Sequence, residues 1–270
     1  MTAFRAWRRT APIVPLMMAA VLAACGTTRK DDDNSQQGGE RLYLEAKEDL
    51  NAGNYEAAIK ELEKVEGRAA GTMLSQQASI DLAYAYYKTG DKAQALSALD
   101  RFIKLHPSSP ALDYALYLRG LVNFNDNLGL LGSFARQDLS ERDQQASRDA
   151  YQSFKQLVEQ FPGSTYAPDA RVRMDYIVNA LAAYELHVAR YYFRRGAYVA
   201  AANRAQQAVQ EFQQAPATEE ALYIMAQSYD KLGLDKLRDD ADRVLKKTFP
   251  NSRFLKEGVT EAKKTWWQFW

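Results

Sequence analysis

The chain repeats itself at an interval of 37 residues. Gly53 and Gly90 stand 37 residues apart, and so do Gly196 and Gly233. Each glycine interrupts a stretch in which apolar residues recur at helical spacing, and no alternating strand pattern is sustained. A fixed period of this length is typical of helix pairs that bury their apolar faces only by stacking on one another. The recurrence therefore favours a helical repeat fold.

A second set of breakers alternates with these glycines. Proline-containing turns stand at 106–110, 161–164, 215–216 and 249–252. Alternating glycine and proline turns predict helix–turn–helix pairs, and the pattern resembles the tetratricopeptide repeat (TPR). The second pair matches it best, with Ala83, Tyr86, Gly90, Ala95, Leu99, Phe102 and Pro107. We therefore expect an all-α fold, an α-solenoid of about five TPR-like helix pairs over residues 40–252. The expected pairs are 40–66, 74–106, 111–161, 168–213 and 218–249.

Two segments depart from the repeat. Residues 126–143 are an insertion in the third pair, with four large apolar residues among glycines and a serine. The insertion is either a loop folded onto its own pair or a partner-binding element, since long loops are often functional. Residues 169–195 contain no glycine or proline and predict one helix of about 27 residues, ~40 Å long. That helix should either project from the stack or bridge its two halves.

Aromatic residues dominate the predicted inner face. With the pairs aligned on the turn glycines, and on Gly120 in the third pair, the inner positions are Tyr43, Lys47, Ile80, Tyr84, Tyr87, Lys88, Tyr114, Tyr117, Leu121, Phe124, Leu186, Arg190, Phe193 and Arg194. We expect a peptide groove formed by Tyr43, Tyr84, Tyr87, Tyr114, Tyr117 and Phe124. Tyrosine offers a large, rigid contact area at low entropic cost. The alternative is an alignment error of one residue, which would make these side chains core aromatics.

The first 24 residues resemble a secretion signal. Three arginines precede a 14-residue stretch, residues 11–24, that is too short to span a membrane. The sequence Leu22-Ala23-Ala24-Cys25 resembles a lipobox, in which the cysteine is acylated and becomes the new N-terminus. Cys25 is the chain's only cysteine, so no intrachain disulfide can form. The alternative is an ordinary signal followed by an incidental cysteine. Gly26 in place of Asp favours the outer membrane.

The segment after Cys25 is polar throughout. Residues 26–39 contain no aliphatic or aromatic side chain, so we expect residues 25–39 to be a lipidated cysteine and a disordered tether. Removing the signal removes three of the 35 basic residues and leaves 32 against 34 acidic ones. A net charge of −2 lacks the positive field that nucleic-acid binding requires. Membrane attachment is therefore expected to come from the lipid.

Tryptophan is concentrated in residues 253–270. Trp266, Trp267 and Trp270 are the only tryptophans after the signal segment. This aromatic tail has three possible destinations: the fifth helix pair, a partner, or the membrane interface, where tryptophan is favoured.

Catalytic and metal sites have little support in the sequence. His106 precedes a turn proline and His187 lies within a helix, and neither has a second histidine or a cysteine nearby to complete a zinc site or a triad. The adjacent Glu219 and Glu220 fall at a helix start, where carboxylates favour the helix dipole. We therefore expect no enzyme activity, no metal and no cofactor.

Taken together, the signal, tether, insertion and long helix resemble the BamD family, also called ComL. The local sequences 84–88 (YAYYK), 100–104 (DRFIK) and 195–199 (RGAYV) add to the resemblance. The resemblance implies a scaffold of the outer-membrane β-barrel assembly machine, anchored at the periplasmic face of the outer membrane. It implies that the C-terminal half binds BamA, alongside other lipoproteins of the machine. It also implies that the N-terminal half receives unfolded outer-membrane proteins through their C-terminal aromatic signal.

Three functions remain open from the sequence. The first is the assembly scaffold, with Arg190, Arg194 and Arg195 expected to bind the partner. Arg194 and Arg195 end the long helix, so a purely structural role in complementing the helix dipole is the alternative. The second function is a TPR adaptor of cell-wall or division machinery. The third is a cell-wall hydrolase, against which the lack of a plausible catalytic set argues.

Overall fold

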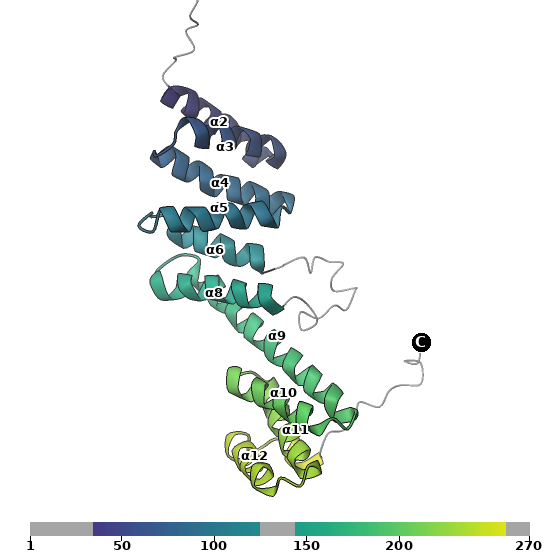
Figure 1. Cartoon of the computed structure of the whole chain (residues 1–270). Helices are drawn as coiled ribbons and strands as arrows, with labels where there is room; N and C mark the ends of the chain where they lie inside the picture. Colours follow the sequence, from purple (N-terminus) through teal and green to yellow (C-terminus); the bar gives the residue numbers. More distant parts are fainter. Residues whose placement is uncertain (1–34, 125–143, 258–270) are drawn as a thin grey trace, which may run out of the picture. The chain divides into compact units, whose positions relative to one another are not determined.

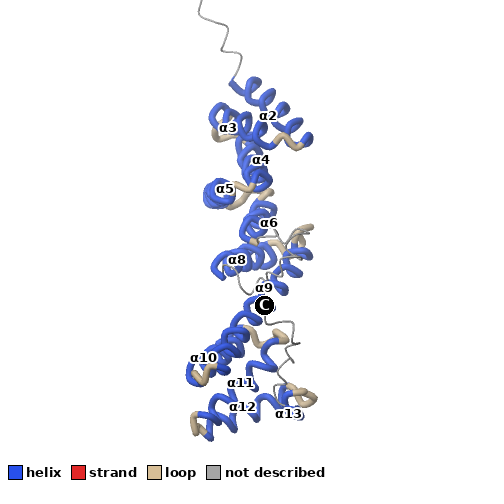
Figure 2. The backbone as a smooth tube through the Cα atoms, turned by 90° about the vertical axis from the view of Figure 1, so that its right-hand side faces the viewer, coloured by secondary structure: helices blue, strands red, loops and turns tan. Residues whose placement is uncertain are grey.

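All regular structure described here is helical. The computed structural model describes residues 35–124 and 144–257, which contain helices joined by turns (Figures 1 and 2). Residues 1–34, 125–143 and 258–270, and with them Cys25, the insertion and most of the aromatic tail, lie outside the described residues. The helices are α2 (Ser35–Ala52), α3 (Tyr55–Arg68), α4 (Met73–Thr89), α5 (Lys92–Leu105), α6 (Leu112–Asn123), α8 (Gln144–Gln160), α9 (Ala167–Arg194), α10 (Tyr198–Glu211), α11 (Ala217–Lys231), α12 (Asp235–Thr248) and α13 (Phe254–Glu257). Apart from α13, they form the five expected pairs, which confirms the predicted all-α repeat fold.

The chain divides into two compact units, Met1–Asp81 and Leu82–Trp270. The described part of the first unit holds α2, α3 and the beginning of α4. The rest of α4 and all later helices belong to the second unit. No helix among the described residues is long and apolar enough to cross a membrane.

Four pairs turn on a glycine in the left-handed conformation. The φ angles are +81° at Gly53, +83° at Gly90, +75° at Gly196 and +70° at Gly233. At each turn two backbone hydrogen bonds close the first helix. In α4, for example, the amide of Asp91 donates to the carbonyl of Tyr86 at 2.9 Å, and that of Gly90 donates to Tyr87 at 3.2 Å. This is the Schellman motif, which glycine adopts without a steric penalty. The 37-residue glycine spacing therefore reflects a repeated backbone requirement.

The first unit begins earlier than expected. Helix α2 starts at Ser35, so residues 35–39, predicted to belong to the tether, are helical. Gly39 is buried, and a Cβ at this position would lie 3.5 Å from Ala69 and 3.6 Å from Leu74. Both distances are ordinary van der Waals contacts, so α2 packs here against the end of α3 and the start of α4. The tether prediction was wrong for residues 35–39 because it considered only their lack of aliphatic and aromatic side chains.

Helix α9 links two apolar clusters of the second unit. The predicted long helix is confirmed as a single helix of 28 residues. Its first half contributes Ile177 and Leu181 to a cluster with Phe154, while its second half contributes Leu186 and Ala189 to a cluster with α10 and α11. Figure 1 shows α9 running from α8 to the group formed by α10, α11 and α12. Helix α9 therefore connects the two clusters, which is the second of the two expected arrangements.

Gly120 is not a turn glycine. It lies inside α6 and is buried, and a Cβ there would be 2.3 Å from Cε1 of Phe154. In the other pairs, the position seven residues before the turn glycine holds an alanine that is fully buried: Ala46, Ala83, Ala189 and Ala226. Gly120 occupies the corresponding close-packing position, facing α8. Aligning the third pair on Gly120 as the small residue of its first helix, equivalent to Ala83 in the second pair, therefore agrees with the structure.

Candidate functional site

In the first unit, Tyr43 belongs to a polar cluster around Asp81. The hydroxyl of Tyr43 donates to Oδ2 of Asp81 at 2.8 Å, and Nζ of Lys47 lies 3.3 Å from the same oxygen. Gln77 donates to the other carboxylate oxygen at 3.4 Å. Burial, together with the hydrogen bond to Asp81, raises the pKa of Tyr43 above its ordinary value. The phenol therefore stays protonated, and its half-buried ring is held in place by its hydroxyl.

In the second unit, Tyr84 and Tyr87 lie on one side of α4. Their spacing of three residues places them on one helical face, and both are half-buried. Nζ of Lys88 lies 6.0 Å from the centroid of the Tyr84 ring. These two tyrosines thus provide aromatic surface with an adjacent positive charge.

Tyr114 and Tyr117 of α6 pack on an aromatic residue that sequence reasoning missed. Tyr166, just before α9, stacks on Tyr117 with ring centroids 4.9 Å apart and lies 5.3 Å from Tyr114. The Tyr117 hydroxyl donates to Asp169 at 2.8 Å, and burial together with this bond raises the pKa of Tyr117 to about 12. Tyr166 stands two residues after the second proline turn, residues 161–164, and this position was the available signal.

Asp169 joins this aromatic cluster to Arg173. Nε of Arg173 lies 2.6 Å from Oδ2 of Asp169. Burial raises the pKa of Asp169, but the hydrogen bonds from Arg173 and Tyr117 outweigh it and lower the pKa below its ordinary value. The carboxylate therefore remains charged and fixes the start of α9 against α6.

Three predicted inner-face residues belong to the core. Phe124 is only 8% exposed and packs edge-on against Phe154, with centroids 6.2 Å apart. Ile80 and Leu186 are 1% and 6% exposed. Phe124 is therefore a core aromatic and not part of an exposed groove. For this residue, the alternative interpretation of the inner-face aromatics as core residues is the correct one. Two residues of α9 cover the Phe124 ring: the Tyr176 ring centroid lies 5.9 Å from its centroid, and the guanidinium of Arg173 lies 5.0 Å from it.

Arg190 is committed to an ion pair inside the second unit. Both its Nε and its Nη2 donate to the carboxylate of Glu220 on α11, which is 6% exposed. A neighbouring pair joins Arg204 of α10 to Glu185 of α9 at 3.1 Å, and Glu185 is 3% exposed. The two buried carboxylates thus hold α9 to its neighbours. Arg190 therefore has a structural contact with Glu220. A partner that bound Arg190 would have to share this residue with Glu220.

Arg194 and Arg195 are both exposed, at the end of α9. The guanidinium of Arg195 lies 5.5 Å from the ring centroid of Tyr191. Beside them is an open apolar hollow lined by Gly196, Ala197, Tyr198, Val199, Ala200, Asn203 and Leu232. Val199 is 59% exposed, a large fraction for an aliphatic side chain. This turn surface, residues 194–203 with Leu232, therefore combines positive charge with accessible apolar area.

Neither histidine belongs to a site of recognisable chemistry. His106 lies against Phe102, with ring centroids 5.1 Å apart, and His187 is exposed on α9. Across the described ranges, no group of three potential metal-ligating side chains comes together.

Comparisons with known proteins point in one direction. The model of a family described as an outer membrane lipoprotein, YfiO, matches residues 35–245. The outer membrane protein assembly factor BamD of Neisseria meningitidis serogroup B is 48% identical over 231 residues, which cover 86% of each chain. The protein of the same name from Haemophilus influenzae is 37% identical over 204 residues, 76% of this chain and 78% of its own. The crystal structure of MamA protein aligns at a TM-score of 0.34 and 16% identity over 83% of this chain and 97% of its own, which is too low to carry an argument.

Proposed function

Because the chain belongs to the YfiO family of outer membrane lipoproteins, we propose that it is a non-catalytic scaffold for assembling β-barrel proteins into the outer membrane. The observation that carries the proposal is the 48% identity, over most of both chains, with a protein named as an outer membrane protein assembly factor. The resemblance to the BamD family expected from the sequence is thereby confirmed. The partners that follow are BamA, other lipoproteins of the machine and unfolded outer-membrane proteins.

Attachment to the periplasmic face of the outer membrane is proposed to depend on Cys25. Residues 1–24 would be removed as a signal and Cys25 acylated, and several acyl chains on one cysteine would anchor the protein durably. The polar segment between Cys25 and the start of α2 then serves as the tether. Its proposed length is shorter than the sequence implied because α2 begins at Ser35.

Unfolded clients are proposed to bind the aromatic surface formed by Tyr84, Tyr87, Tyr114 and Tyr117. Support comes from the half-buried rings, which leave part of each aromatic face accessible, and from Lys88 beside Tyr84. Rigid rings of this kind suit an extended segment that carries its own aromatic side chains. Tyr43 is proposed as a further aromatic contact on the first unit. Phe124 is not part of the proposed surface, because it is buried.

BamA is proposed to bind the turn surface of the fourth pair. The support is physical: an exposed valine and an apolar hollow lie beside two exposed arginines. Protein interfaces combine an apolar centre with a polar rim, and arginine is enriched in them. Arg194 and Arg195 are the better candidates for this rim, because Arg190 is bound to Glu220.

Depletion of the protein in its own bacterium tests the proposed function. Folded β-barrel proteins in the outer membrane should fall, measured by their heat-modifiable mobility on gels, while inner-membrane proteins stay constant. Re-expression of the wild type should restore the barrels. Normal barrel levels after depletion, with defects confined to the cell wall, would contradict an assembly role.

A further inference from the structure

One row of side chains along the first half of α9 is apolar and open to solvent. Residues four positions apart form a ridge on a helix, and this ridge holds Pro168, Val172, Tyr176 and Ala180. Val172 is 68% exposed and Tyr176 is 44% exposed, while Pro168 is exposed and Ala180 is half-buried. Single apolar side chains are common on protein surfaces, but a contiguous row of them is typical of a contact site. We call these four residues the α9 ridge.

A series of contacts within the second unit joins the α9 ridge to the aromatic surface. The hydroxyl of Tyr117 donates to Asp169 at 2.8 Å, and Nε of Arg173 lies 2.6 Å from the same carboxylate oxygen. The guanidinium of Arg173 lies 5.0 Å from the centroid of the Phe124 ring, and the ring of Tyr176 packs edge-on against that ring at 5.9 Å. The half-buried Tyr117 and the exposed ridge are therefore held in fixed positions relative to one another.

The spacing of the α9 ridge matches that of an extended chain. Four residues of an α-helix rise ~6 Å, and side chains on one face of a β-strand repeat every ~6.6 Å. From Pro168 to Ala180 the ridge is ~18 Å long, which corresponds to roughly five or six strand residues. Transmembrane β-strands alternate apolar and polar residues. Such a segment can place its successive apolar side chains against successive turns of the ridge and keep its polar side chains in water.

We propose that the α9 ridge continues the client-binding surface and selects extended segments in which apolar and polar residues alternate. This inference rests on the proposed function in receiving unfolded outer-membrane proteins, and it adds the residue pattern that the surface recognises. Asp175 and Asn179 lie in the adjoining row of α9 and are exposed, so they give the apolar ridge a polar rim. A client segment bound at Tyr117 reaches the ridge within the second unit.

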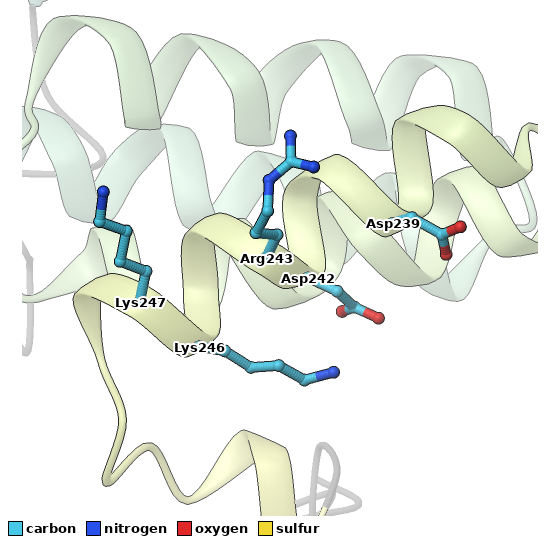
Figure 3. A pocket seen from close by; sticks show the side chains of 5 residues that line it. All are labelled: Asp239, Asp242, Arg243, Lys246 and Lys247. Carbon is cyan, nitrogen blue, oxygen red and sulfur yellow. The ribbon is translucent and has the colours of Figure 1, made fainter.

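The outer face of α12 differs from this arrangement. Charged residues line an open hollow there: Asp239, Asp242, Arg243, Lys246 and Lys247 (Figure 3). On the same helix, Leu237 and Val244 are 46% and 43% exposed, but neither has an exposed apolar side chain four positions away. Helix α12 therefore provides a control that has exposed apolar side chains but no ridge.

Binding of two labelled synthetic peptides tests the proposal. Each has about ten residues, the length of a transmembrane strand. In one, valine and tyrosine alternate with serine and glutamine, and in the other the same residues are arranged with the apolar ones consecutive. Fluorescence anisotropy is measured on protein that lacks residues 1–24 and carries Cys25→Ser. The wild type should bind the alternating peptide more tightly than the rearranged one.

The ridge variant combines Val172→Gln with Tyr176→Gln. It should bind the alternating peptide roughly tenfold more weakly than the wild type and lose the preference between the two peptides. The control combines Leu237→Gln with Val244→Gln and should keep both the affinity and the preference. Circular dichroism should show that both variants are folded, because glutamine favours helices and the replaced side chains are exposed. If the ridge variant is not folded, Val172→Gln alone takes its place, with a smaller loss of the same preference expected.

Three results would overturn the proposal. The first is a ridge variant that keeps the wild-type preference while Tyr84→Ala with Tyr117→Ala weakens binding, in which case clients bind the aromatic surface without the ridge. The second is wild-type protein that binds both peptides equally, which removes the selection of an alternating pattern. The third is wild-type protein that binds neither peptide, which contradicts client binding itself.

Discussion

At the scale of single residues, Gly120 sets the distance between α6 and α8. Replacing it with alanine should destabilise the protein, because the new Cβ would lie 2.3 Å from Phe154 in a packed interior. Overpacking costs roughly 1–3 kcal/mol, which exceeds the gain of about 1 kcal/mol from replacing a helical glycine. Urea unfolding followed by circular dichroism measures the difference.

Gly67, within α3, is the matched control. A Cβ there would meet nothing within 4 Å, so Gly67→Ala should be neutral or stabilising. Equal or greater stability of Gly120→Ala relative to wild type would show that the close approach of α6 to α8 is misjudged.

The aromatic surface makes a second residue-scale prediction. Combining Tyr84→Ala with Tyr117→Ala should weaken binding of a peptide that ends in phenylalanine by roughly tenfold, since truncated aromatic contacts cost about 1–2 kcal/mol. Fluorescence anisotropy of a labelled peptide measures the change. The double Tyr→Phe variant keeps both rings and should bind nearly as well as wild type, because the Tyr117 hydroxyl is already bonded to Asp169. Unchanged affinity of the alanine variant would remove the surface from the proposal.

At the scale of helices, two arginines close together on α9 should behave differently. Arg190→Glu places a negative charge against the buried Glu220 and should lower the free energy of unfolding by roughly 2–4 kcal/mol. Arg195→Glu should change it by no more than about 0.5–1 kcal/mol, because Arg195 is exposed and its guanidinium lies against the ring of Tyr191. Chemical denaturation of both variants separates the two roles.

One of these variants, Arg195→Glu, also tests the proposed contact with BamA. Arg195→Glu should reduce recovery of BamA from solubilised envelopes although the fold is intact. Arg171→Glu, also exposed on α9, serves as the control and should recover BamA normally. If Arg195→Glu recovers as much BamA as this control, the turn surface is not the partner site.

The ends of the helices could be predicted from the sequence because they depend on residues at the turn itself. A left-handed glycine closes each of the four turns, so Gly53, Gly90, Gly196 and Gly233 marked them correctly. Gly120 was aligned with the small residues of the other first helices, and it lies inside α6 against Phe154. The burial of Phe124 could not be predicted in this way, because the residues that cover its ring, Arg173 and Tyr176, lie far along the chain on α9.

The ion pairs of α9 could not be predicted because they join distant residues. Arg190 and Glu220 are 30 residues apart, and Glu185 and Arg204 are 19 apart. From the sequence, Glu220 was interpreted as a carboxylate that stabilises a helix dipole. It does lie in the first turn of α11, but it is also buried, which that interpretation did not include. Only the packing of α9, α10 and α11 shows that these carboxylates are enclosed and need partners.

At the scale of the whole molecule, we propose that the protein is a scaffold with separate contact surfaces. Within the second unit, the aromatic surface lies on α4 and α6, and the turn surface begins at the end of α9. Helix α9 spans the two apolar clusters between them as one continuous helix of 28 residues. A client and BamA could therefore bind at the same time without competing for the same side chains.

The most direct test of the central claim is affinity purification of the lipidated protein from detergent-solubilised envelopes, with its partners identified by mass spectrometry. The account predicts recovery of BamA in amounts comparable to the tagged protein, together with other lipoproteins of the assembly machine. A Cys25→Ala variant should lose the envelope fraction and serves as the background control. Recovery of cell-wall synthases or division proteins without BamA would contradict the account.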